Sequence, residues 1–461
     1  MLSFDSSFFR PLWNFFGVAL FMPVLAGGLT LGATAWADDD HHSRENDRAL
    51  KLLSLIPIPA SATNGTGGMY VDDISFVDQT TQTYFLADRS NAVVDMVDAK
   101  TGSFIRQIHA TPAFAGVSPA GNAQSGPDGV VSAFPFLFVT DANSRVVSFD
   151  LRTTPPTQVS DVTTNAGDPL RGDELAYDPE DGILLVINNA DPTPFATLIS
   201  VDKTTGKLTV GKRITFSTAG SGVDATNGAE QPIWDPSTHR FYLSIPQIGT
   251  NVANGGVIRI NPATATVEAI FTVMNCGPAG LSRGPGDDGR HDALIGCNTV
   301  FDTAGNVWSP TGTVPADTRD VIIDLASGNI DREIFGAGAG DEVWYNPGDN
   351  NYYATGSGSP LKPLPSATAS GATPLAVIDA ADQKLESLVP TYNVAAATGA
   401  NAHPAGTSHT VAANAGNNHV FVAIPANNAF LSPDGKTNCL TGCIAVFGHP
   451  DEDSDQMADR H

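Results

Sequence analysis

The sequence predicts an all-β protein, a single seven-bladed β-propeller, on the basis of three observations. A polar turn anchored by Asp or Asn recurs at spacings of 52, 52, 59, 63 and 55 residues. Strand-length runs of β-branched and aromatic residues separate these turns, and no segment after the leader shows a long helical period. Repeats of about this length, built only from strands, are typical of propeller blades of about four strands.

Two repeated signals mark each unit. The turn occurs at 97–102, 149–154, 201–206, 260–265, 323–328 and 378–383. Upstream of these turns, short strands start near Asp73, Asp128, Glu174, Gln231, Gly280, Glu342 and His409. Counting these starts gives seven units, and Asp128 and Gly280 mark theirs less clearly than the others.

The last unit lacks an outer strand of its own, because it stops after 443–447 and only an acidic tail follows. A spare apolar strand at 50–58 can complete it, which would close the ring and remove an exposed sheet edge. We therefore expect one propeller domain over 49–449, with its last blade closed by the N-terminal strand.

The N-terminus predicts export. An apolar run at 15–26 follows Arg10 and leads to the small residues Ala35 and Ala37 around Trp36, a pattern typical of a cleaved signal peptide at 1–37. An uncleaved anchor is the alternative, although a spanning helix needs about 20 largely apolar residues. After cleavage we expect no transmembrane anchor, a disordered N-terminus at 38–48, an acidic disordered tail at 450–461, and a periplasmic or secreted protein.

Charge and cysteine content narrow the partners and the compartment. The net charge is −25, which repels phosphate backbones and argues against nucleic acid as a partner. The four cysteines are compatible with two disulfides in an oxidising compartment. Cys276 and Cys297 flank one expected strand and its return, whereas Cys439 and Cys443 close a very short loop.

Two motifs carry a family resemblance. The Asp-x-x-Thr-Gly turns resemble those of bacterial YVTN-type propeller repeats, and Gly126-Pro127-Asp128-Gly129 is similar to a strand start of SMP-30/gluconolactonase-like propellers. The resemblance implies a divalent metal, often calcium, in the central channel on Glu, Asn and Asp ligands. Asp128 matches that pattern, but the fifth unit has Pro278-Ala279-Gly280 where the family would place an Asn ligand.

The starts of the innermost strands converge at one mouth of a propeller channel, which makes them the candidate site. Asp73, Asp128, Glu174 and Glu342 are the expected metal ligands, backed by Asp72, Asp173, Glu230 and Asp341. Converging carboxylates repel one another, and Ca²⁺ or another divalent cation would relieve the repulsion. Alternatively, these side chains bind backbone amides at the junctions between blades. No separate cofactor-binding residues are expected.

The function stays open between two classes. A binding or scaffold propeller would take a small molecule or a protein at a rim, with a metal site in its channel. The alternative is a metal-dependent lactone or ester hydrolase of the gluconolactonase-like type, with His409 as its catalytic base. The scaffold interpretation is favoured because a complete catalytic motif is missing, and enzymatic activity is left undecided.

Overall fold

The structure is a computed structural model that describes residues 49–62, 64–285, 291–308, 318–337, 340–355, 374–391, 398 and 408–450. The expected leader at 1–37, the segment at 38–48 and the tail from 451 onward lie outside the described residues. No helix among the described residues is long and apolar enough to cross a membrane.

The described strands form five four-stranded sheets, one eight-stranded sheet and one two-stranded ribbon. The first four-stranded sheet contains β2 (Ser75–Asp78), β3 (Thr83–Asp88), β4 (Val93–Asp98) and β5 (Ser103–Ile108). The second contains β6 (Val130–Ala133), β7 (Phe136–Asp141), β8 (Arg145–Asp150) and β9 (Thr157–Thr163). The third contains β10 (Leu175–Asp178), β11 (Ile183–Asn188), β12 (Phe195–Val201) and β13 (Leu208–Thr215).

The eight-stranded sheet is two groups of four strands. One group is β14 (Pro232–Asp235), β15 (Arg240–Ile245), β16 (Asn254–Asn261) and β17 (Thr266–Met274). The other is β18 (Cys276–Arg283), β19 (Asp292–Val300), β20 (Arg319–Asp324) and β21 (Ile330–Phe335). A single parallel pairing, Asn254 with Cys276, joins the two groups.

The remaining sheets lie toward the C-terminus. One contains β22 (Glu342–Asn346), β23 (Asn351–Thr355), β24 (Leu375–Asp379) and β25 (Lys384–Val389). The other has the order β1 (Lys51–Pro57), β30 (Cys443–Gly448), β27 (His419–Ile424) and β26 (Val411–Asn414). The ribbon pairs β28 (Asn427–Leu431) with β29 (Asn438–Cys439), and η1 (Asn122–Gln124) is a short 3₁₀ helix.

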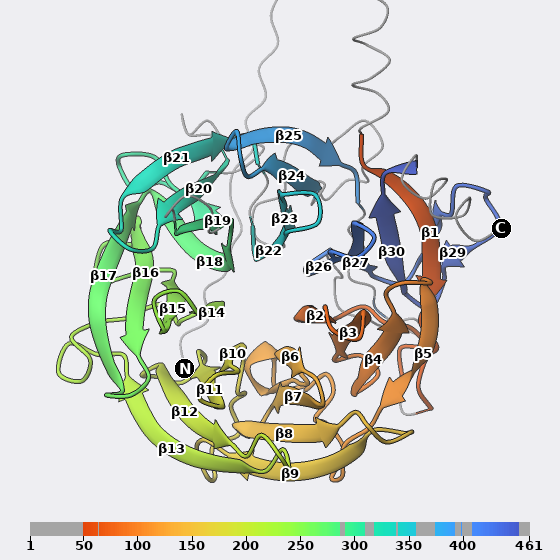
Figure 1. The fold of residues 1–461 in the computed structure, drawn as a ribbon, viewed down its shortest axis with the longest axis horizontal. Coiled ribbons are helices and arrows are strands. Elements are labelled where there is room, and N and C mark those ends of the chain that lie inside the picture. The colour runs from red at the N-terminus through yellow and green to blue at the C-terminus, as the bar shows by residue number, and fades with distance from the viewer. Residues whose placement is uncertain are drawn as a thin grey trace, which may run out of the picture. The chain divides into compact units, whose positions relative to one another are not determined.

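The sheets follow one another around a centre, with β2, β6, β10, β14, β18, β22 and β26 as the innermost strands (Figure 1). These strands contact each other in the order β2, β6, β10, β14, β18, β22 and β26, and β26 returns to contact β2. The starts of the inner strands therefore lie close together although they are far apart in sequence. This all-β arrangement of four-stranded antiparallel sheets is propeller-like.

The N-terminal strand β1 pairs antiparallel with β30, from Lys51 opposite Gly448 to Pro57 opposite Cys443. This is the pairing expected from the sequence. Leu50 and Leu55 enter the same apolar cluster as Phe447 of β30. The first and last described strands thus complete one sheet, and β30 is covered on the edge that would otherwise be exposed.

Burial follows strand position within each sheet. The second strand β7 is buried at every residue, whereas the outermost β9 alternates between exposed and half-buried positions. The apolar clusters lie between consecutive sheets; one of them joins Phe85 and Val94 to Leu137 and Phe149. Packing on both faces explains why the middle strands are apolar without alternation, while the outer strands have a period of two.

The repeated turns and the cysteines also follow the sequence pattern. In the turn after β4, the Asp98 carboxylate accepts hydrogen bonds from the backbone N–H groups of Lys100 and Thr101, and Gly102 has a φ of +66°. The expected disulfides are present, Cys276 with Cys297 and Cys439 with Cys443. Two disulfides are compatible with an extracellular or periplasmic protein.

Candidate functional site

The start of each inner strand is held by the strand that follows it. The Asp73 N–H donates to Ala87 O in β3, the Asp128 N–H to Thr140 O in β7, and the Asp173 N–H to Ile187 O in β11. Glu230 and Asp341 make the same contact with Ser244 and Thr355. The structurally equivalent positions are therefore the following set: Asp73, Asp128, Asp173, Glu230 and Asp341.

This register corrects the sequence alignment by one residue in three units. The sequence placed Glu174, Gln231 and Glu342 at the same level as Asp73 and Asp128, with Asp173, Glu230 and Asp341 behind them. The backbone contacts place the latter set level with Asp73 instead. A shift of one residue reverses the direction of a strand's side chains, and short strands carry too little pattern to fix it.

The strand starts surround a polar cavity of about 220 Å³. Its lining residues are Asp73, Arg89, Asn122, Arg171, Asp173, Glu174, Asn189, Glu230, Asp341, Glu342 and His409. Carboxylates outnumber the two arginines and the histidine, so the cavity has an excess of negative charge. Gln231 and Gly280 do not line it, and the Gln231 side chain instead accepts a hydrogen bond from the Leu281 N–H at 2.6 Å.

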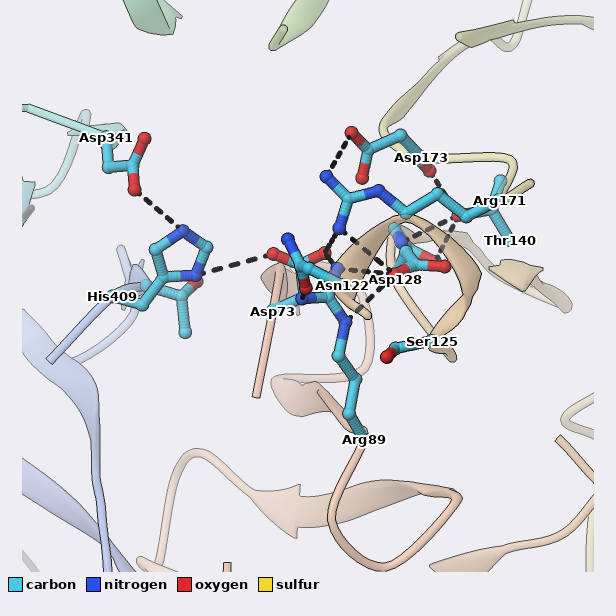
Figure 2. A network of polar contacts seen from close by, with 12 residues as sticks. Asp73, Arg89, Asn122, Ser125, Asp128, Thr140, Arg171, Asp173, Asp341 and His409 are labelled. Carbon is cyan, nitrogen blue, oxygen red and sulfur yellow. Dashed lines mark hydrogen bonds and ion pairs between the residues drawn. The ribbon is translucent and has the colours of Figure 1, made fainter. Parts of the chain in front are cut away.

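One region of the cavity is an ion-pair network around Arg89, which we call the arginine region: Asp73, Arg89, Asp128, Arg171 and Asp173 (Figure 2). Arg89 donates from Nε to Asp128 Oδ1 at 2.9 Å, and from Nη2 to both Asp73 and Asp128. Arg171 donates from Nη2 to Asp173 Oδ2 at 2.9 Å, and its Nη1 lies 3.6 Å from Asp128 Oδ1. Two guanidinium groups thus link three buried carboxylates.

Burial and ion pairing have opposing effects on the pKa values in the arginine region, and burial has the largest single effect on each. Burial raises the pKa of Asp128 well above its usual value, while Arg89 and Arg171 oppose that rise. Burial would lower the pKa of Arg171, but Asp173 and Asp128 hold it above its ordinary value. The two guanidinium groups lie against the buried carboxylates and take the place of the hydration that these have lost.

His409 lies between two carboxylates (Figure 2). Its Nε2 is 2.8 Å from Asp341 Oδ2, and its Nδ1 is 3.4 Å from Asp73 Oδ1. Burial opposes protonation, but Asp341 and Asp73 raise the pKa of His409 to about 10. The imidazole is consequently protonated at neutral pH and acts as a cation of the network.

The opposite charge balance is found in the glutamate region, which we define as Glu174, Glu230 and Glu342. Glu174 is 6% exposed and Glu342 is 3% exposed. No hydrogen-bond donor among the described residues reaches the carboxylates of these three side chains. Burial raises the pKa of Glu174 well above its usual value, and Glu342, Asp173 and Glu230 raise it further.

The pKa values of the other two glutamates, Glu230 and Glu342, are raised for the same reasons. Burial, with Asp173 and Asp341, raises the pKa of Glu230 to about 8. Burial also raises the pKa of Glu342 well above its usual value, although His409 opposes this. Each of these carboxylates lowers stability when it ionises, because burial disfavours its charge.

The structure brings together the residues that the sequence singled out, and adds two basic ones. Asp73, Glu174, Glu342 and His409 line the cavity, and Asp128 lies directly behind its wall. Arg89 and Arg171 were not among the site residues expected from the sequence. Arg89 directly follows β3, whose end returns to the rim where β2 starts, so antiparallel pairing was the signal that could have located it.

A close metal-binding geometry is found in the arginine region. Among the described residues, Asp73, Asp128 and Asp173 form a group whose ligand atoms lie within 4.8 Å of one another. The carboxylates of these three residues accept hydrogen bonds from Arg89 and Arg171. A divalent ion on the oxygens that the arginines contact would have to displace guanidinium groups. The prediction of Asp73, Asp128, Glu174 and Glu342 as metal ligands stays a prediction.

Comparison with known proteins supports the fold and does not assign a family. No protein-family model matches the chain, and no curated protein matches it. A structure of Kuenenia stuttgartiensis hydrazine synthase is similar, with a TM-score of 0.54 and 13% identity over 79% of this chain and 94% of that one. A chain of the mitotic checkpoint complex has a TM-score of 0.52 and 10% identity over 93% of this chain and 99% of that one. At these identities the likeness shows a β-propeller-like fold and nothing of function.

Proposed function

We propose that this protein is an exported, non-catalytic binding propeller with seven blades, the last closed by β1, and that it binds a cation at the mouth of its central channel. The observation that carries the proposal is the glutamate region. Glu174 and Glu342 are buried side chains that line a cavity and have no hydrogen-bond donor among the described residues. A cation would supply the missing charge and donors.

The donors of the cavity support this choice. Arg89 is bound to Asp73, Asp128 and Asn122, Arg171 donates to Asp173, and His409 Nε2 contacts Asp341. The Nε and Nη1 atoms of Arg171 form no hydrogen bond but are shielded from the cavity. Six of the eleven lining residues are carboxylates, and Asn122 and Asn189 are the lining amides, so the cavity favours a cation over an anion.

The hydrolase alternative has less support. A general base must be unprotonated at the working pH. The pKa of His409 is raised to about 10 by its carboxylate neighbours after burial has opposed the shift. His409 is better explained as an ion-pair partner of Asp341 and Asp73 than as the base of a metal-bound water.

Thermal unfolding with added cations tests the proposal. Binding to the folded state stabilises it by mass action, so calcium chloride or a small amine should raise the melting temperature of the wild type. Glu174→Gln should abolish the rise, whereas the exposed Glu386→Gln, with the same change in charge, should leave it intact. An unchanged melting temperature with both kinds of cation would contradict the proposed function.

A further inference from the structure

We infer that Asp88 and Asp95 share one proton inside the first sheet, and that this proton makes the turn that carries Arg89 sensitive to pH. The inference concerns two carboxyl groups that do not line the cavity, and it does not depend on the proposed cation-binding function. It follows from how the two side chains lie on one face of the sheet and from which hydrogen-bond donors reach them.

The two side chains are neighbours on one buried face of the sheet. Strand β4 pairs with β3 so that Asp95 lies opposite Leu86. Asp88 follows Leu86 by two residues, so its side chain points to the same side of the sheet, and Asp88 and Asp95 are diagonal neighbours. Both are 0% exposed, because this side packs against the last sheet, where Leu86 joins an apolar cluster with Phe421.

The hydrogen-bond donors around the pair are unequal. Asp88 accepts hydrogen bonds from the backbone N–H of Asn91 at 2.9 Å and from its Nδ2 at 2.5 Å. Asp95 Oδ1 accepts one bond from Gln107 Nε2 at 3.2 Å, and Asp95 Oδ2 is buried without a donor among the described residues. The carboxyl groups of Asp88 and Asp95 are hydrogen-bonded to each other. Ionised carboxylates are acceptors only, so this bond requires a proton.

The donors assign the proton to Asp95. Burial, and then the charge of Asp88, raise the pKa of Asp95 well above its usual value. Burial raises the pKa of Asp88 as well, but the hydrogen bonds from Asn91 oppose that rise. A protonated Asp95 can donate to the Asp88 carboxylate, so both buried groups then have a partner.

The groups that face the pair do not supply a positive charge. Asp72, in the segment before β2, is 5% exposed and raises the pKa of Asp95 further. Tyr84 of β3 stays neutral, because burial raises its pKa above the usual value. Strand β5 contributes the neutral Gln107. The last sheet presents the apolar side chains of Phe421, Ile444 and Val446 on this side.

The basic groups of this part of the molecule are bound elsewhere. His409 and Arg89 act on Asp72. His409 is paired with Asp341, and the Arg89 guanidinium group is paired with two carboxylates of the arginine region. A second negative charge at the buried pair would therefore be uncompensated.

The shared proton stabilises the turn that holds Arg89. Asn91 closes this turn through its two hydrogen bonds to Asp88, and Arg89 lies directly between these two residues in sequence. Asn91 Oδ1 also accepts hydrogen bonds from the Ser61 N–H at 2.8 Å and from Asn64 Nδ2 at 2.7 Å. The turn is thus joined to the segment that follows β1.

Loss of the proton changes the position of Arg89 in the cavity. From its turn, Arg89 reaches Asp73 and Asp128 (Figure 2). An ionised Asp95 repels the Asp88 carboxylate that anchors this turn. The folded state binds a proton that the unfolded state releases above the ordinary aspartate pKa. The turn therefore loses stability as pH rises through the raised pKa of Asp95.

Infrared spectroscopy of protein labelled isotopically at its aspartate carboxyl carbons tests whether the proton is present, because the label separates aspartate from glutamate. At neutral pH we expect Asp95→Asn to lose a component of the C=O band of protonated aspartate. The variant should fold, since its amide can donate to Asp88 as the protonated acid does. The control Asp224→Asn, at an exposed position, should keep the whole band. An unreduced band in Asp95→Asn would overturn the inference, and so would a wild type without a protonated aspartate band.

Hydrogen-exchange mass spectrometry of the peptide spanning 88–96 tests the link to the turn. After correction for intrinsic exchange, we expect the wild type and Asp224→Asn to lose protection of this peptide as pH rises from about 6 to about 10. Asp95→Asn should keep its protection, because it has no proton to lose. An equal loss in Asp95→Asn, or constant protection in the wild type, would show that the turn does not depend on this proton.

Discussion

The arginine region and the glutamate region lie in one cavity but differ in how their carboxylates are compensated. In the arginine region, Asp73 and Asp128 share the guanidinium group of Arg89. In the glutamate region, Glu174 has carboxylates as its neighbours and its pKa is raised by burial and by Glu342. Arg89 and Arg171 supply positive charge to the first region, whereas no basic side chain among the described residues is hydrogen-bonded to the glutamates of the second. An acidic cavity therefore indicates a binding site only after each carboxylate has been matched with its partner in the protein.

The largest effect is expected from removing β1, the strand that completes the last sheet. Deletion of residues 49–58 takes away β1 and leaves the edge of β30 unpaired. We expect a markedly lower unfolding temperature, because an apolar cluster loses Leu50 and Leu55 and the ring loses its closure. Thermal unfolding followed by circular dichroism measures this, and an unchanged transition would show that ring closure does not depend on β1.

Arg89→Met should be the most damaging single change in the cavity. It leaves Asp73 and Asp128 buried without their shared guanidinium partner, and breaking a buried pair in this way costs about 3–5 kcal/mol of unfolding free energy. Arg152→Met is the matched control, since Arg152 forms an exposed ion pair with Asp150 and its loss should have little effect. Denaturant titration of both variants gives the comparison, and equal losses would refute the special status of the arginine region.

When no ligand is present, Glu342→Gln should raise the unfolding free energy, whereas Arg89→Met lowers it. The amide keeps the shape of the side chain and removes a charge that its surroundings disfavour. We expect a gain in unfolding free energy at pH values above the ordinary glutamate pKa, because the folded state disfavours the ionised form of Glu342. The same denaturant titration detects it. A loss comparable to that of Arg89→Met would mean that Glu342 has a stabilising partner in the folded protein.

The smallest effect concerns pH. The pKa of Glu230 is raised by burial, and then by Asp173 and Asp341, to about 8. The folded state therefore binds more protons than the unfolded state between the ordinary glutamate pKa and about 8, and stability falls as pH rises through this window. Glu230→Gln should flatten the decline of melting temperature from pH 5 to 8. Glu386→Gln should keep the slope of the wild type, and identical slopes for all three proteins would contradict the assignment.

Much of the fold could be predicted from the sequence, because local residue patterns define the repeat. The Asp98-x-x-Thr101-Gly102 turn predicts both the Asx-type hydrogen bonds and the positive φ that the structure has. The spare strand at the N-terminus and the missing strand at the C-terminus predicted the pairing of β1 with β30. These signals depend on neighbouring residues, and on counting strands in each repeat.

The site was predicted less fully, because it depends on register and on contacts between units. The predicted strand starts indicated the correct end of the channel. A four-residue strand such as β10 carries too little pattern to show whether Asp173 or Glu174 is equivalent to Asp73. Arg89 directly follows β3, and Arg171 lies in the connection between β9 and β10. Only the fold shows that both side chains meet Asp128.

The most direct test of the division into two regions is a crystal structure of the protein grown with calcium chloride. We predict density for a cation beside Glu174 and Glu342, with Arg89 still bound to Asp73 and Asp128. A spherical peak with calcium's anomalous signal on Asp73, Asp128 and Asp173, with Arg89 displaced, would contradict this account.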